Sequence, residues 1–401
     1  MENIAQLRAS PTEEWIEALR ARYPVEPSID KALTSKLKKR GQGDYQSPTF
    51  DDIEGRLRRL ISASTDAPIE IHNLRSLTGG ASKEQFVFEL DWSDNGAQRT
   101  GDRMVLRCEP AASIVETDRR REFELMQFAE PLMPVPRVHW IDDDGTIMGT
   151  PALVSSFVTG VQKPSKVASN VSGMGTHFAK PLRDKLVPQY ARYMAALHKA
   201  PIEDGQLPSF ARPAVGTTEA ALQIVNWWGR CWQEDLFEPS MISLITEDWL
   251  RRNAPVLDHL SVVHGDFRTG NFLFDEASGE ITAILDWELG YLGDRHADLA
   301  WVLTDLYQTY EDGRPYHCGL FESADAFIEA YEAAGGLPID RGKLAWHKLF
   351  CTWKQYILSL GCALRAGNGL THQDVLLTWL SAGGYPIAES LRLQLDSLIE
   401  Q

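Results

Sequence analysis

Apolar positions along the chain change their spacing near residue 158, from a period of about two to a helical period. In the run 84–92, for example, Phe86, Phe88 and Leu90 fall on one face. The strands expected before the change span 69–77, 84–92, 102–108, 137–141 and 146–158. One helix, 117–130, interrupts them and ends at Pro131, because proline cannot continue a helix. The pattern predicts a small lobe with a sheet and one inserted helix.

Helical spacing dominates the rest of the chain. The helices expected there span 184–199, 218–236, 248–259, 296–310, 324–334, 341–361 and 373–382. One compact β segment, 261–287, lies between them. A mainly helical lobe is therefore expected to follow the sheet lobe, and the class is α+β.

The first 48 residues predict helices of their own, ahead of a helix at 49–62 for which Thr49 is a suitable N-cap. The helix near 29–40 is rich in lysine and has a thin apolar face, which favours a solvated charged surface over a partner or membrane surface. We expect a helical extension at 1–48, a sheet lobe at 49–158 and a helical lobe at 159–401.

Charge and composition narrow the class of protein. The 401 residues contain 40 Lys+Arg and 56 Asp+Glu, a formal net charge of −16 that argues against nucleic acid as a partner. Neither a secretory leader nor an apolar run of membrane-spanning length is visible, and the five cysteines form no CxxC pair. We expect a cytoplasmic monomer or homodimer without a membrane partner.

Candidate chemistry is concentrated in the β segment. The loop 264–271 carries Asp266 and Asn271, and a hairpin folded about Ser278 and Gly279 would place Asn271 directly opposite Asp286. Carboxylate and amide oxygens are the ligands that Mg²⁺ prefers. Any one of the three residues alone is better explained by an Asx turn, but together they predict a magnesium site.

These residues resemble a known family. His264-Gly265-Asp266, Asn271 five positions later, Leu285-Asp286-Trp287-Glu288 and the later Asp298-Leu-Ala-Trp are similar to the aminoglycoside phosphotransferase/choline kinase-like family. Within that family, these motifs are most similar to the kinase domains related to those fused to acyl-CoA dehydrogenases. The resemblance covers about 74–367, and it implies a two-lobed protein-kinase-like fold with a small antiparallel sheet lobe and a mainly helical second lobe.

The resemblance also implies roles for the loop and hairpin residues. Asp266 matches the catalytic aspartate that orients the acceptor hydroxyl, whereas Asn271 and Asp286 match ligands of Mg²⁺. His264 and Asp298 match residues that support the catalytic loop, and we expect them to be structural.

In the sheet lobe, the resemblance implies a nucleotide site. Gly79, Gly80 and Ser82 lie in the loop that would cover the phosphates of ATP, where glycine lets backbone N–H groups approach. Arg107 stands where protein kinases carry a phosphate-binding lysine, and arginine keeps its charge and grips phosphate in bidentate fashion. Its expected partner is Glu122, with Glu124 as the alternative.

The resemblance places the adenine beside the segment 155–160, where the Ser156 carbonyl and the Val158 N–H would meet its edge. The acceptor is expected to be a small molecule near Asp266, with Arg268, Glu288 and Trp287 as candidate contacts. A stripe of aromatic residues in 341–361 is better explained by core packing.

The resemblance implies an ATP- and Mg²⁺-dependent kinase that phosphorylates a hydroxyl of a small metabolite. A hydroxyacyl-CoA or another hydroxylated catabolite is the leading acceptor. Two alternatives stay open. One is an aminoglycoside-type antibiotic kinase, which normally needs a dense acidic pocket, whereas the segment 373–401 is not rich in acidic residues. The other is a nucleotide-binding pseudokinase, and the presence of all three of Asp266, Asn271 and Asp286 argues against it.

Overall fold

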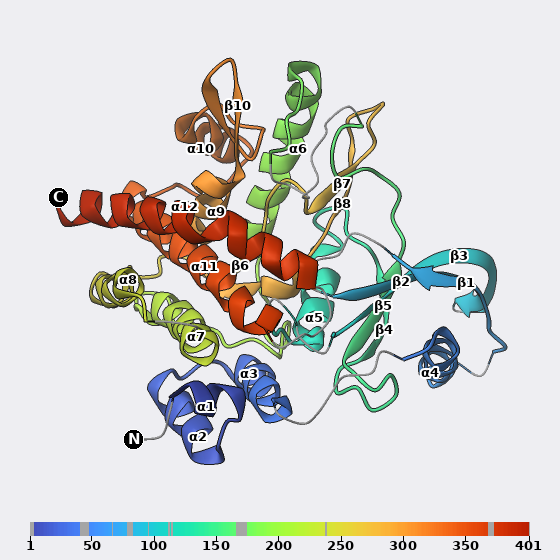
Figure 1. The fold of residues 1–401 in the computed structure, drawn as a ribbon. Helices are drawn as coiled ribbons and strands as arrows, with labels where there is room; N and C mark the ends of the chain where they lie inside the picture. The colour runs from blue at the N-terminus through green and yellow to red at the C-terminus, as the bar shows by residue number, and fades with distance from the viewer. Residues whose placement is uncertain are drawn as a thin grey trace.

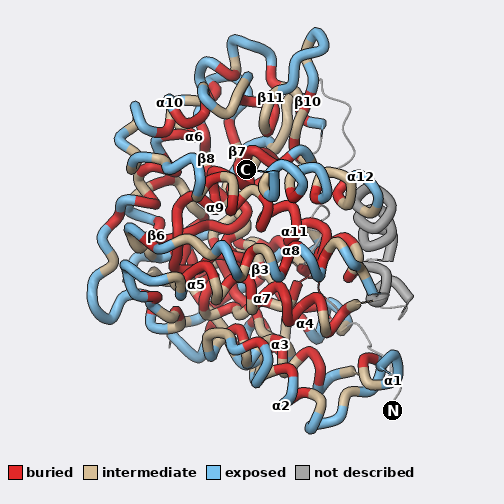
Figure 2. Tube along the Cα trace, turned by 90° about the vertical axis from the view of Figure 1, so that its left-hand side faces the viewer, coloured by how far each residue is buried: buried red, intermediate tan, exposed pale blue. Residues whose placement is uncertain are grey.

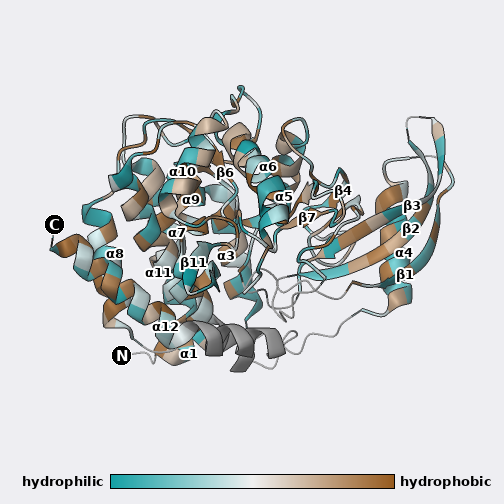
Figure 3. Cartoon of the chain, turned by 90° about the horizontal axis from the view of Figure 1, so that it is seen from above, coloured by the Kyte–Doolittle hydropathy of each residue, from teal (hydrophilic) through white to brown (hydrophobic). Residues whose placement is uncertain are grey.

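A sheet lies at one end of the molecule and most of the helices gather at the other, as the views from the front and from above both show (Figure 1, Figure 3). This computed structural model describes residues 4–40, 48–65, 67–77, 83–94, 96–110, 113, 115–165, 175–236, 239–367 and 373–400. The predicted α+β class, with a small antiparallel sheet and a mainly helical second part, is confirmed.

The sheet has five antiparallel strands in the order β1-β2-β3-β5-β4. Its strands are β1 (Glu70–Ser76), β2 (Glu84–Asp94), β3 (Ala97–Cys108), β4 (Val138–Asp142) and β5 (Ala152–Ser156). Helices α4 (Phe50–Ser62) and α5 (Arg119–Ala129) cover opposite faces, because Val154 packs in the cluster that contains α4 whereas its neighbour Leu153 packs in the cluster that contains α5. Thr49 caps α4, as predicted, in a reciprocal capping box with Asp52.

The helical part is built around α11, whose central turns are buried (Figure 2). Its helices are α6 (Lys180–Lys199), α7 (Glu219–Asp235), α8 (Met241–Arg252), α9 (His296–Val302), α10 (Ala324–Ala333), α11 (Arg341–Gly367) and α12 (Gln373–Ile399). Three short antiparallel pairs join it, β6 (Ser261–Val263) with β9 (Tyr291–Gly293), β7 (Phe272–Phe274) with β8 (Ile281–Ile284), and β10 (Gln308–Glu311) with β11 (Arg314–His317). None of the described helices combines the length and the apolar character needed to cross a membrane.

Five predicted helices have clearly different bounds in the structure, and three of them are longer than expected: α6 begins at Lys180, α11 continues to Gly367 and α12 continues to Ile399. The helix expected at 296–310 ends at Val302, and the chain continues into the β10–β11 hairpin, because Asp312 and Gly313 both take positive φ and form a tight turn. The helix expected at 248–259 begins earlier, where Ser240 caps α8, and it ends at Arg252, ahead of Pro255.

Three helices precede α4: α1 (Ile4–Ala9), α2 (Glu13–Arg22) and α3 (Pro27–Lys39). The thin apolar face of α3 is buried, since Ile29, Leu33 and Leu37 expose at most 1% of their surface. Ile29 and Leu33 belong to the main core cluster, whereas Leu37 packs with α2. The helix is therefore packed against the rest of the protein and presents only its outer, lysine-bearing face to solvent.

Candidate active site

The loop between β6 and β7 is held by Asp298, which lies in the first turn of α9 and has no exposed surface. Its two carboxylate oxygens accept the N–H groups of His264 at 2.7 Å and Gly265 at 2.8 Å, and His198 Nε2 lies 3.0 Å from one of them. Burial would raise the pKa of Asp298, but the hydrogen bond from His198 and these neighbours hold it below its usual range. An ionised carboxylate thus fixes the start of the loop.

His264 also stabilises the loop from within. Its Nδ1 accepts the Asp266 N–H at 3.2 Å, so its Nε2 carries the proton and donates to the Leu285 carbonyl at 3.0 Å. Burial lowers the pKa of the imidazole, which keeps it neutral, and the ring packs 4.5 Å from the Trp287 ring. His264 connects the loop to the hairpin strand that ends at Leu285.

Asp266 is 8% exposed and accepts hydrogen bonds from three side chains. Trp301 Nε1 and Arg268 Nε donate to Oδ1 at 2.5 and 3.0 Å, and Asn271 Nδ2 donates to Oδ2 at 2.5 Å. The same Asn271 amide nitrogen donates to the Asp266 carbonyl at 3.0 Å. The carboxylate is therefore held in one orientation, and the Asn271 amide presents its oxygen on the side away from Asp266.

The predicted pairing of Asn271 with Asp286 is wrong by one residue. The Asn271 carbonyl accepts the N–H of Leu285 at 2.7 Å, and Asp286 follows beyond the paired strand. The hairpin turns one position earlier than predicted, since the Asp275 N–H donates to the Glu280 carbonyl and Phe274 pairs with Ile281. A bulge at Thr282, whose hydroxyl donates to the Thr159 carbonyl at 2.8 Å, then recovers part of this difference and leaves Asn271 facing Leu285. Asp286 still lies at the mouth of the hairpin, one position further along.

Asp286 has left-handed backbone angles, φ 69° and ψ 57°, which aspartate tolerates better than most residues do. One of its oxygens lies 3.1 Å from Arg107 Nη2, and the side chain remains 30% exposed. Burial, then the charges of Glu288 and Asp266, raise the pKa of the Asp286 carboxyl against the opposing effect of Arg107. An excess of negative charge therefore surrounds this group.

Arg107 extends from β3 and meets Glu122 on α5, with Nη1 and Oε1 separated by 2.6 Å. Glu124, the alternative partner, instead accepts both the N–H and the hydroxyl of Ser209. The Arg107–Glu122 pair belongs to a buried network of charged side chains. The other members of this network are Asp286, Lys83, Glu109, Arg119 and Glu288.

Sequence reasoning missed Lys83, Glu109 and Arg119. Lys83 Nζ lies 2.8 Å from Glu109 Oε2, and Arg119 Nη2 lies 3.1 Å from Glu288 Oε2. Lysine and arginine are rarely this buried unless they are paired, but pairs so far apart along the chain leave no local pattern. The one usable signal is the position of Lys83, directly after the glycine-containing loop.

Two predicted acceptor contacts do not lie at an open surface. Trp287 has no exposed surface, and its Nε1 donates to the Ile284 carbonyl at 3.1 Å. Glu288 belongs to the buried network near Arg107. Arg268, by contrast, lies beside Asp266, with its guanidinium 4.9 Å from the centre of the Tyr307 ring.

A buried lysine that the sequence did not single out lies next to the loop. Lys354 on α11 donates to the Gly265 carbonyl at 2.6 Å, and its ammonium is 4.1 Å from the centre of the Trp301 ring. Burial lowers its pKa, while the nearby Asp266 charge acts in the opposite direction. Lys354 thus holds the Gly265 carbonyl, and Trp301 holds the side chain of the next residue, Asp266.

The expected adenine-binding segment follows β5. Ser156 pairs with Met104 in the sheet, and its hydroxyl lies 2.8 Å from His139 Nε2. Among the described residues, the Val158 N–H has no hydrogen-bond acceptor, and it is therefore available to a ligand. Gly79, Gly80 and Ser82 lie outside the described residues.

The donor set at the hairpin mouth fits Mg²⁺. It combines the Asp286 carboxylate with the amide oxygen of Asn271, whose nitrogen is oriented by Asp266. The carboxylates of Glu288 and Asp266 also lie near enough to act on Asp286, and a divalent cation would offset this repulsion.

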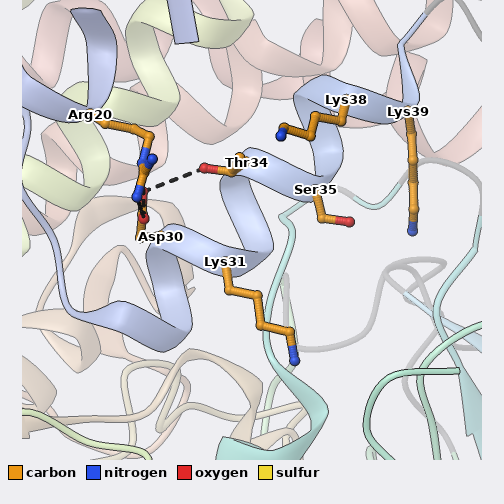
Figure 4. Close-up of a pocket in the computed structure, with 7 residues that line it drawn as sticks. All are labelled: Arg20, Asp30, Lys31, Thr34, Ser35, Lys38 and Lys39. Atoms are coloured by element: carbon orange, nitrogen blue, oxygen red, sulfur yellow. Dashed lines mark hydrogen bonds and ion pairs between the residues drawn. The ribbon is translucent and has the colours of Figure 1, made fainter. Parts of the chain in front are cut away.

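A separate hollow of about 370 Å³ lies on the first helices of the chain, and its lining contains none of the site residues (Figure 4). It is lined by Arg20, Asp30, Lys31, Thr34, Ser35, Lys38 and Lys39. Arg20 is paired with Asp30 at 2.6 Å and Lys38 with Glu13 at 3.1 Å, so part of its positive charge is already compensated.

Residues 74–347 match the model of a family described as the phosphotransferase enzyme family. Acyl-CoA dehydrogenase family member 10 of Mus musculus is 27% identical over 262 residues, which are 64% of this chain and 22% of that protein. The chain thus spans less than a quarter of the length of that relative. The aminoglycoside 3'-phosphotransferase of Streptomyces fradiae is 30% identical over 223 residues, which are 54% of this chain and 72% of that protein.

The fold is shared with solved structures. A Ralstonia eutropha JMP134 protein assigned to the aminoglycoside phosphotransferases aligns with a TM-score of 0.61 and 20% identity. The alignment covers 87% of this chain and 98% of that protein, so the likeness extends through both the sheet and the helical part.

Proposed function

This chain belongs to the phosphotransferase enzyme family, and we propose that it is a small-molecule kinase that transfers the γ-phosphate of ATP to a hydroxyl of a small metabolite. The observation that carries this proposal is the contact of Asp266 with Asn271 at the hairpin mouth that also bears Asp286. This arrangement joins a fixed carboxylate to an oxygen-rich metal site, the parts that phosphoryl transfer requires.

In the proposed reaction, Asp266 orients the acceptor hydroxyl and takes its proton as the oxygen attacks the γ-phosphorus. The bond from that phosphorus to the β–γ bridging oxygen breaks, and ADP leaves. Mg²⁺ held by Asn271 and Asp286 would neutralise charge on the phosphate oxygens. Since Asp266 accepts three hydrogen bonds in one orientation, its contribution is mainly positioning.

Arg107 is the proposed ligand of the α- and β-phosphates. It is held by Glu122 and lies next to Asp286, so it joins the nucleotide phosphates to the metal site. We assign Gly79, Gly80 and Ser82 to the loop over the phosphates, and the Ser156 carbonyl and Val158 N–H to the adenine edge. Solved relatives of the same fold support a nucleotide site, since one is described as a complex with ADP and another as a complex with GDP.

Arg268 is the proposed contact for an anionic group of the acceptor. Its Nε donates to Asp266 at 3.0 Å, so its guanidinium lies beside the carboxylate that orients the acceptor hydroxyl. We propose a hydroxyacyl-CoA or another hydroxylated catabolite as the leading acceptor. The similarity to acyl-CoA dehydrogenase family proteins supports this choice.

An aminoglycoside is the second candidate acceptor, supported by the 30% identity to the Streptomyces fradiae enzyme. A panel of hydroxylated acyl-CoAs, aminoglycosides, choline, sugars and amino alcohols, read by ADP formation with Mg-ATP, separates the two. We expect turnover with a hydroxylated acyl-CoA and none with kanamycin. Turnover with aminoglycosides alone would replace the leading acceptor by the second, and no ADP above the background of Asp266→Asn with any compound would refute the proposal.

A further inference from the structure

Helix α3 lies outside the family match, yet its first turn is hydrogen-bonded to the helix that carries Glu122. Its Ile29 and Leu33 belong to the main core cluster, which also contains Leu125 and Met126 of α5. Trp227 and Trp228 of α7 belong to the same cluster, and α3 contacts α7 directly. Helix α3 is therefore part of the core that joins α5 to the helical part.

Arg121 is the main polar link between α3 and α5, and it is 1% exposed. Its Nη2 lies 2.8 Å from Glu26 Oε1, at the N-cap of α3, and its Nη1 donates to the Ser28 hydroxyl at 2.9 Å. Nη2 also donates to the Gly290 carbonyl at 3.0 Å, four residues after Asp286. One guanidinium thus joins the N-terminal helix, α5 and the segment that follows the proposed metal ligand.

Lys36 forms a second link, at the other end of α3. Its ammonium is buried and lies 3.6 Å from Glu116, just before α5, and 2.7 and 3.1 Å from Glu234 and Asp235 at the end of α7. Burial would lower the pKa of Lys36, but the three carboxylates raise it, and the charge is kept. One end of α3 is therefore anchored to α5, and the other end is anchored to the segment just before α5 and to the end of α7.

We propose that α3 is a positioning element of the kinase, with Glu26 and Ser28 fixing Arg121 so that its neighbour Glu122 is presented to Arg107. The proposal rests on the phosphate-binding role assigned to Arg107. Glu122 pairs through one oxygen with Arg119 on its own helix and through the other with Arg107 on β3. Only the pair with Arg107 joins two elements, so it depends on the rotation of α5 relative to the sheet. Glu26 and Ser28 touch no reacting group and act through α5.

The test is the double variant Glu26→Gln with Ser28→Ala, which removes the ion pair and one hydrogen-bond acceptor but keeps an amide oxygen for the Ala211 N–H. The matched control is Glu17→Gln, which breaks an exposed ion pair with Arg20 on α2. If the double variant does not fold, Ser28→Ala alone, measured in the same way, carries the test.

The first readout is amide hydrogen exchange without nucleotide, which is independent of any enzymatic activity. We expect residues 119–129 to exchange about tenfold faster in the double variant, with α4 and the Glu17→Gln control unchanged. Unchanged exchange in 119–129 would overturn the proposal even if the enzyme is a kinase, and faster exchange would support it even if no acceptor has been found.

The second readout is a double-mutant cycle in steady-state kinetics. We expect the double variant to raise KM for Mg-ATP about fivefold with KM for the acceptor unchanged. In a Glu122→Gln background the same change should have almost no further effect, because both variants disrupt the same pair. If the double variant raises KM for Mg-ATP by the same factor in the parent and in the Glu122→Gln background, α3 contributes only to general stability and the proposal is overturned.

Discussion

Asp266, the proposed catalytic residue, is oriented by hydrogen bonds to both of its carboxylate oxygens. They accept from an indole, a guanidinium and an amide; the last two belong to its own loop, at Arg268 and Asn271, and the indole is that of Trp301 on α9. The backbone before it is held by Asp298 and Lys354. A shift of the acceptor hydroxyl by even an ångström would lose the positioning that such a site provides.

Replacing Asp266 by asparagine removes the proton acceptor and makes one of the three hydrogen bonds a donor–donor contact. We expect kcat to fall by about 10³-fold, while the Kd of Mg-ADP changes by less than about threefold. A coupled assay of ADP formation and isothermal titration calorimetry measure the two effects. Asp325→Asn, an exposed ion-pair residue on α10, serves as the control and should match the parent. Parental turnover in Asp266→Asn would contradict the assigned role.

Replacing Asp286 by asparagine keeps a side chain that tolerates left-handed backbone angles but removes the charge. The proposed metal ligand is lost and the repulsion with Glu288 is relieved at the same time. We therefore expect the affinity for Mg-ADP to fall more than tenfold, and the affinity for ADP in EDTA to stay equal or rise. Titrations with and without Mg²⁺ measure this difference, and an unchanged magnesium effect would refute the metal assignment.

At the scale of elements, the sequence predicted the strands of the five-stranded sheet and most helices because their apolar residues recur with a regular period. It missed the short strands β9, β10 and β11, and it placed the β7–β8 turn one position too late, so Asn271 faces Leu285 and not Asp286. The Asp266–Asn271 contact could be foreseen because both residues lie in one short loop. The contacts of Lys83, Arg119 and Lys354 could not, since they depend on how distant elements pack.

Strands β4 and β5 carry a pH-dependent contact beside the expected adenine segment. Burial, and then the charge of Arg137, lower the pKa of His139 to about 4, against about 6.5 in an unfolded chain. Between these values the unfolded chain binds more protons, so folding stability should fall as pH falls from about 6.5 to 4. Because His139 is only half-buried, we expect a loss of roughly 1–2 kcal/mol. His139→Gln should reduce this loss in thermal unfolding at pH 7 and 4.5, and equal pH dependence in both proteins would contradict the prediction.

At the scale of the whole molecule, helix α3 shares the main hydrophobic core with much of the family-matched region. Leu33 on α3 has no exposed surface and belongs to the same cluster as residues of α5, α7 and α11. The chain that precedes the family match is therefore built into the folded body. The net charge of −16 does not prevent binding of ATP, the expected polyanionic substrate. The cations proposed to bind it are concentrated at one site, and the net charge of the whole chain does not describe that site.

Leu33→Ala should lower the free energy of unfolding of the whole protein by roughly 3 kcal/mol, because it leaves a cavity in the shared core. Leu393→Ala on α12, where the side chain is 54% exposed, should have a much smaller effect. Differential scanning calorimetry measures both. An early, separate transition for the N-terminal helices, with the main transition unmoved, would show that the core is not shared.

The left-handed backbone at Asp286 restricts which amino acids can stand there in related proteins. Glutamate would keep a carboxylate but carries the full steric cost of positive φ, and glycine would accept the angles but bring no oxygen ligand. Residue 286 must therefore meet two requirements, an oxygen ligand in its side chain and a backbone that tolerates positive φ. In a library of all substitutions at residue 286, asparagine and glycine should retain the native fold at little cost, and no substitution should retain both the fold and the charged ligand.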